Sequence, residues 1–231
     1  MLASSAAHTA TSLPVLAQVF GWTAGSVGIS VGWPQAWRLW VGRRHAGLSL
    51  SSNVLTVLYS MAWLLYGVAS HHFVQIVTCA VGFGVATAVL VGHVRLSRPG
   101  TRSWLPLLAL SSVLVFALFA AGRKPLGVAA SLATISGVVP QVISLVSDRR
   151  RGVHSVGGVS IARWVLSVIC NVLWCGYGLL VHDALIAVNS TIIGVLCAAI
   201  VVLTASSARI ELLTTEAAEE LSAAALSCAP R

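Results

Sequence analysis

Hydroxyl, amide and indole side chains recur at the same spacing in two separate apolar segments of the chain. The segment 162–181 carries such groups, followed by a glycine, at i, i+4, i+7 and i+11, namely Ser167, Asn171, Trp174 and Gly178. The matching positions of the segment 53–70 hold Thr56, Ser60, Trp63 and Gly67. Because a helix places residues with this spacing on one face, each segment is expected to present one polar and aromatic face.

Side chains of these types could together bind a neutral polyol. Hydroxyl and amide groups are costly in hydrocarbon unless they find partners, so both faces are expected to point inward. A flat indole can stack on the apolar face of a sugar ring while amides and hydroxyls bind the hydroxyl groups of the sugar. Two further candidates lie in the segments that follow: Asn189 and, 111 residues earlier, Thr78. The alternative is that the tryptophans are interfacial anchors and that Asn189 only bridges two helices.

The composition places these segments in a membrane. Of the 231 residues, 57% are hydrophobic and 9% are charged, and the mean hydropathy is +0.91. Crossing about 30 Å of hydrocarbon at about 1.5 Å per residue needs a long apolar run. Suitable runs are 15–40, 53–70, 73–93, 104–122, 126–147, 162–181 and 184–207. The sequence therefore predicts an all-α integral membrane protein with seven transmembrane helices.

The basic residues predict how these helices are oriented. Arginines cluster after the first, third and fifth spans, at 43–44, 95–102 and 149–151, whereas the connections after spans two and six hold no lysine or arginine. Basic loops stay in the cytoplasm, so we expect the N-terminus outside the cell membrane and the C-terminus inside. The net charge of +8 is then a topology signal, and no nucleic-acid partner is expected.

The two polar faces belong to a duplicated block. The motif Trp-x-x-Tyr-Gly occurs at 63–67 and again at 174–178, and a Pro-Gln pair precedes each copy. Both blocks carry arginines after their first helix, so they face the same way and need an extra crossing between them. The predicted organisation is therefore 3+1+3, with parallel repeats about an axis along the membrane normal.

This organisation divides the chain into five parts. They are an extracytoplasmic N-terminus 1–14, a first three-helix repeat 15–95, a linker helix within 96–125, a second three-helix repeat 126–207 and a cytoplasmic tail 208–231. The tail has the pattern of a short amphipathic helix, and disorder is the alternative.

The duplicated motifs resemble those of the PQ-loop and SWEET transporter superfamily. The Pro-Gln pairs are Pro34-Gln35 and Pro140-Gln141, near the cytoplasmic end of the first helix of each block. The stretch 174–189 then has the order of Trp-x-x-Tyr-Gly-Leu-Leu, an acidic residue and an asparagine. The resemblance implies a seven-helix transporter that works by alternating access, with these prolines and the adjacent glutamines as hinge or gate.

The resemblance also implies where substrate binds. The expected binding residues are Trp63, Trp174, Asn189, Asn171, Thr78 and Ser60. The family usually has asparagine in both halves, so Thr78 is a departure from the family pattern. An asymmetric pocket is therefore predicted.

The positions of the ionisable residues bear on the mechanism. No acidic residue lies within a predicted span, and no histidine lies near the middle of one. Proton-coupled carriers usually need a titratable group at membrane depth, so the prediction is passive uniport of a neutral mono- or disaccharide. Two alternatives stay open: a proton-coupled amino acid transporter of the PQ-loop type, and a non-transporting seven-helix receptor or scaffold.

No enzyme activity is expected from this sequence. The cysteines within the spans are scattered, without a paired Cys/His spacing, so no metal site is predicted and no cofactor is implied. The expected partners are a small-molecule sugar and membrane lipid. The oligomeric state, including a homo-oligomer, is left open.

Overall fold

The computed structural model describes residues 2–43, 50–97, 122–151 and 161–227. Their helices are α1 (Leu2–Trp40), α2 (Leu50–Ala69), α3 (Phe73–Ser97), α5 (Arg123–Arg150), α6 (Ile161–Leu180) and α7 (Ala184–Ser227). Each contains a stretch long and apolar enough to cross a membrane. No strand occurs within these residues, so the described part of the chain is all-helical, and its six apolar helices are those of a multi-pass membrane protein.

Six of the predicted spans coincide with these helices. The remaining predicted span, 104–122, lies outside the described residues except for Gly122, so the 3+1+3 arrangement remains a prediction. Helix α7 continues well past its apolar stretch Ala184–Ser207 and ends at Ser227. Residues 208–227 contain good helix formers and neither glycine nor proline, which explains the helical tail.

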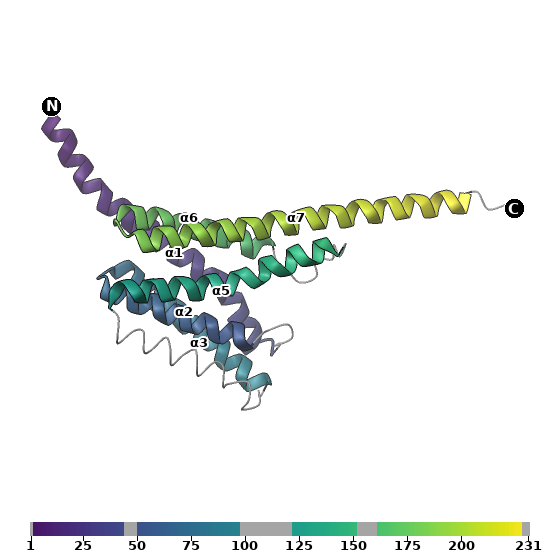
Figure 1. Cartoon of the computed structure of the whole chain (residues 1–231), viewed down its shortest axis with the longest axis horizontal. Helices are drawn as coiled ribbons and strands as arrows, with labels where there is room; N and C mark the ends of the chain where they lie inside the picture. Colours follow the sequence, from purple (N-terminus) through teal and green to yellow (C-terminus); the bar gives the residue numbers. More distant parts are fainter. Residues whose placement is uncertain (1, 44–49, 98–121, 152–160, 228–231) are drawn as a thin grey trace.

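The six helices form a closed ring of contacts. Each helix contacts the next in the order α1, α3, α2, α5, α7 and α6, and α6 contacts α1 again. Figure 1 shows α6 and α7 along one side of the bundle and α2 and α3 along the other, with α1 and α5 between them. The third helix of each half, α3 or α7, therefore lies between the other two. The C-terminal part of α7 projects beyond the bundle (Figure 1).

Equivalent turns join the second and third helices of the two halves. His71 and His182 have positive φ angles of 57° and 55°. The following residue donates its backbone N–H to the carbonyl five residues earlier, at 3.0 Å for His72 and 2.8 Å for Asp183. This is the Schellman arrangement that ends a helix. His72 and Asp183 therefore occupy equivalent places, directly before α3 and α7.

The glycine of the repeated motif allows two helices of each half to approach closely. A Cβ atom added to Gly178 of α6 would lie 2.6 Å from the backbone nitrogen of Ala187 in α7. A Cβ atom on the equivalent Gly67 of α2 would lie 3.3 Å from the backbone nitrogen of Ile76 in α3. Small residues are favoured where membrane helices pack this closely.

Gly178→Ala is expected to destabilise the protein by about 1–3 kcal/mol, because the backbone of α7 must move to admit the new methyl group. The measurement is the unfolding temperature of the purified protein in detergent. The matched control is Gly84→Ala in α3, where nothing described lies within 4 Å of the added Cβ atom. An unfolding temperature for Gly178→Ala equal to that of the control would contradict the close approach of α6 and α7.

The tyrosine of the repeated motif joins one half to the other. Tyr66 of α2 packs on Gly127 of α5, where an added Cβ atom would lie 2.7 Å from the tyrosine ring. Tyr177 of α6 packs on Gly21 of α1 in the same way, at 2.9 Å. Both tyrosines are nearly fully buried, in a core cluster drawn from both halves. The contacts between the halves therefore come in matched pairs.

Candidate functional site

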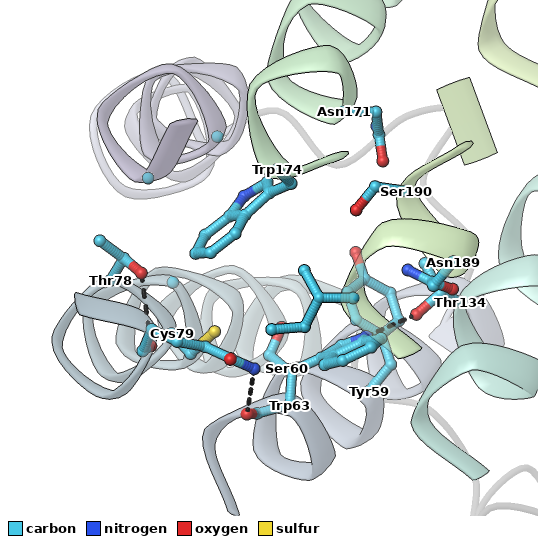
Figure 2. Close-up of a pocket in the computed structure, with 15 residues that line it drawn as sticks. Tyr59, Ser60, Trp63, Thr78, Cys79, Thr134, Asn171, Trp174, Asn189 and Ser190 are labelled. Carbon is cyan, nitrogen blue, oxygen red and sulfur yellow. Dashed lines mark hydrogen bonds between the residues drawn. The ribbon is translucent and has the colours of Figure 1, made fainter. Parts of the chain in front are cut away.

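A cavity of about 210 Å³ lies among the six helices, and each of them contributes to its wall. All six residues that the sequence predicts as substrate-binding line it: Ser60 and Trp63 from α2, Thr78 from α3, Asn171 and Trp174 from α6, and Asn189 from α7. Figure 2 shows Trp174, Asn171 and Ser190 in the upper part of the view and Trp63 and Tyr59 in the lower part. Ser60 and Trp63 of the first repeat therefore meet Asn171 and Trp174 of the second at one cavity.

Only the middle part of each predicted polar face reaches this cavity. Thr56 and Ser167 do not line it, and their hydroxyl groups donate to backbone carbonyls one turn earlier in their own helices, at 2.9 and 3.0 Å. Gly67 and Gly178 pack against the third helix of their halves instead. The face that points inward is thus shorter than the spacing alone predicts.

The two cavity tryptophans are held by matching contacts. The Trp63 ring packs edge-on against Tyr66 with centroids 5.5 Å apart, and Trp174 packs against Tyr177 in the same way at 5.3 Å. Trp63 also donates its Nε1 proton to Thr134 Oγ1 at 3.0 Å, as Figure 2 shows. Rings fixed in this way present defined planar faces, so both indoles can act as preformed stacking surfaces.

The polar groups of the cavity differ in what they can offer a ligand. Thr78 and Asn171 each donate a hydrogen bond of 2.8 Å to a backbone carbonyl of their own helix. Asn189 is 8% exposed, and its Oδ1 atom is buried and accepts no hydrogen bond from the residues that the structure describes. The Oε1 atom of Gln75 is buried and unpartnered within the same residues. Two amides of the cavity wall thus have oxygens that are buried and unpartnered within the described residues.

Several lining residues are not among those predicted from the sequence, including Gln75, Thr134, Ser190 and Tyr59. Gln75 lies one helical turn before Thr78 on the same face, and Ser190 follows Asn189 directly, so a signal for these two was present. Thr134 and Tyr59 had no signal beyond their polarity in an apolar segment.

A hydrogen-bonded link joins the two halves one helical turn beyond the tryptophans. The Tyr66 hydroxyl donates to the Asp183 carboxylate, with O···O distances of 2.9 and 2.8 Å to its two oxygens. Asp183 Oδ1 also accepts from the backbone nitrogens of Leu185 and Ile186 at the start of α7, as a helix cap does. His72 Nδ1 lies 3.8 Å from Asp183 Oδ2.

Asp183 lies between the predicted spans 162–181 and 184–207, so the sequence alone predicts no structural role for it. Asp183 is in fact buried, at 8% exposed, and its carboxylate is one of the places where the two repeats meet. Tyr66 and Asp183 are 117 residues apart, so no local pattern reports their contact.

Comparison with known proteins gives a family match for one part of the chain. Residues 124–204, which cover most of the second repeat, match the MtN3_slv family model, described as "Sugar efflux transporter for intercellular exchange". The second repeat is therefore similar to the SWEET/MtN3 family. This is a family of membrane transporters and not of enzymes.

The SWEET fold extends over most of the chain. The structure is similar to a solved one titled "The 3.7 A resolution structure of a eukaryotic SWEET transporter", with a TM-score of 0.61 and 16% sequence identity. The similarity covers 84% of this chain and 99% of the solved chain. No curated protein matches the sequence.

The residues predicted as hinge or gate lie away from the cavity of this SWEET fold. Pro34 in α1 and Pro140 in α5 are exposed, and both helices continue through them. Gln35 and Gln141 are half-buried, and none of the four lines the cavity. Proline removes one backbone hydrogen bond and makes bending easier, so the hinge role stays a prediction for these positions.

Proposed function

We propose that the protein is a facilitative transporter of neutral sugars, a uniporter that works by alternating access. The observation that carries this proposal is the lining of the cavity. Two indoles, three amides and several hydroxyls line it, and the described lining residues include no Asp, Glu, Lys, Arg or His. An ionic substrate would find no counter-charge there, whereas a sugar needs stacking surfaces and neutral hydrogen-bonding groups.

The size of the cavity favours a small sugar. Its volume of about 210 Å³ lies below the roughly 300–1,000 Å³ that sites for drug-sized ligands have. A monosaccharide is half of a disaccharide, so it is the substrate that we propose first.

The same lining supports passive transport. Coupling to protons would need a group in the cavity that changes its charge near neutral pH, and carboxylates and imidazoles are the usual choice. The buried carboxylate of Asp183, one turn beyond the cavity, is the observation that supports a proton-coupled transporter as the second candidate.

We also propose an orientation in the cell membrane, with the N-terminus outside and the C-terminus in the cytoplasm. Basic residues lie at the C-terminal ends of three helices: Arg43 follows α1, and Arg95 and Arg149 lie in the last turns of α3 and α5. These ends are opposite to the α2–α3 and α6–α7 turns. Since basic ends stay in the cytoplasm, the link between Tyr66 and Asp183 would close the cavity on the outside.

Counterflow of labelled glucose and sucrose into liposomes that contain the purified protein tests this function. We expect glucose counterflow above that of empty liposomes and above that of sucrose, at the same rate with and without an imposed proton gradient. Flux that follows the proton gradient would favour the proton-coupled candidate. Absence of flux for both sugars would contradict the sugar transporter.

A further inference from the structure

The two halves of the cavity carry their amide groups at different positions of equivalent helices. By the offset of 111 residues, Thr78 of α3 corresponds to Asn189 of α7, and Gln75 of α3 corresponds to Ile186 of α7. All four residues line the cavity. The third helix of each half therefore contributes one amide. The amide of Gln75 lies one helical turn closer to the α2–α3 turn than the position equivalent to Asn189 does.

We propose that Gln75 is a sugar-binding and specificity-determining residue that takes the role in the first half that Asn189 takes in the second. The proposal rests on the proposed function as a sugar transporter. It assigns the two amides to different hydroxyl groups of one asymmetrically bound sugar.

Thr78 is unsuited to act as the ligand group of the first half. Its side chain is 6% exposed and packs against Gly25 of α1, where even an added Cβ atom would overlap it. Its hydroxyl proton is donated to the Val74 carbonyl at 2.8 Å. The methyl group of Thr78 thus packs on α1 and its hydroxyl proton is already engaged, which leaves no free donor at position 78.

Gln75 is oriented so that its oxygen is the free end of the amide. The side chain is 2% exposed, and its Nε2 atom donates to the backbone carbonyl of Trp63 at 3.2 Å. That bond fixes the amide beside the stacking surface of Trp63. The Oε1 atom has no hydrogen-bond donor among the described residues. A buried acceptor without a partner is costly, so a ligand that brings a donor is favoured.

Asn189 provides the matching acceptor in the other half. Its Oδ1 atom is likewise buried and unpartnered within the described part of the chain. Two acceptors on opposite halves of a cavity with no charged lining residue select a neutral ligand that carries hydroxyl donors on more than one side. Because the two amides stand at non-equivalent positions of equivalent helices, we expect them to bind different hydroxyl groups of the sugar.

The test is counterflow competition with glucose and its 2-, 3-, 4- and 6-deoxy analogues in liposomes containing the full-length protein. For the wild type we expect at least one deoxy analogue to bind about tenfold more weakly than glucose. Gln75→Leu should weaken glucose binding about tenfold and should remove the discrimination against one particular analogue. Asn189→Leu should remove the discrimination against a different one.

Two variants guard against a merely structural explanation. Ile186→Ala alters the cavity at the equivalent position of the second half without removing a hydrogen bond, so it should leave the order of the analogues unchanged. Gln75→Met has similar length and no hydrogen-bonding amide, so it should repeat the result if Gln75→Leu does not fold.

Two results would overturn the inference, and they differ in meaning. If the wild type carries glucose and the Gln75 variants keep the wild-type order of analogues, Gln75 is not a sugar-binding residue, while the proposed function stands. If the wild type carries and binds none of the sugars, both proposals fail.

Discussion

Trp174→Ala lowers the rate of glucose counterflow by about tenfold to a hundredfold relative to the wild type. The indole lines the cavity and is held edge-on by Tyr177, so its removal takes away a preformed surface on which the sugar ring would stack. Loss of about 1.5–3 kcal/mol of binding free energy corresponds to this range of rates. Trp174→Phe keeps a smaller aromatic face and should retain an intermediate rate.

The control is Trp37→Ala in α1, which also removes an indole from a membrane helix. Trp37 is 59% exposed and does not line the cavity, so its replacement should leave counterflow close to the wild-type rate. If Trp37→Ala and Trp174→Ala reduce the rate equally, the tryptophans act as membrane anchors, and the stacking role is wrong. Trp63→Ala is a less selective test because Trp63 also bonds to Thr134 of α5.

Asp183→Ala lowers the free energy of unfolding by about 2–4 kcal/mol, which is the second large effect that we expect. The substitution removes the cap of α7, worth about 0.5–2 kcal/mol, and leaves the buried Tyr66 hydroxyl without an acceptor, at about 1–3 kcal/mol. Thermal unfolding of the purified protein in detergent measures the loss.

A double-mutant cycle assigns the effect to the link between the halves. Tyr66→Phe removes the hydroxyl and keeps the ring on Gly127, so its loss should be smaller, and the two losses should not add because they share one interaction. Tyr177→Phe is the matched control, since this equivalent tyrosine faces the His72 ring at a centroid distance of 6.0 Å. Strict additivity of Asp183→Ala and Tyr66→Phe would argue that the link contributes nothing to stability.

Much of the cavity was predictable because membrane burial and helical periodicity are local. A polar side chain in an apolar run must face protein, and the spacing from Asn171 to Trp174 puts both on one face. The duplication then predicts an equivalent polar face on α2, with Ser60 and Trp63. These residues do line one cavity together.

Gln75 was not predicted as a lining residue, because the two repeats were compared position by position. The repeat predicts an amide at position 78, where the family usually has asparagine. The amide of the first half instead lies one helical turn earlier, at Gln75. The hydroxyl of Thr78 bonds to its own helix, and its methyl group packs against α1 at Gly25. Such a distance between two helices has no counterpart in the sequence of either one.

The sequence by itself determined the membrane class, six described spans, the repeat and most of the polar lining, because hydropathy, charge clusters and helical spacing act within single segments. Only the tertiary structure decided which groups pair and which stay free. Tyr66 meets Asp183, Trp63 bonds to Thr134, and the oxygens of Gln75 and Asn189 remain unpaired within the described residues. These outcomes depend on how helices distant in the chain pack against one another, and packing is set by the shape and position of all six helices at once.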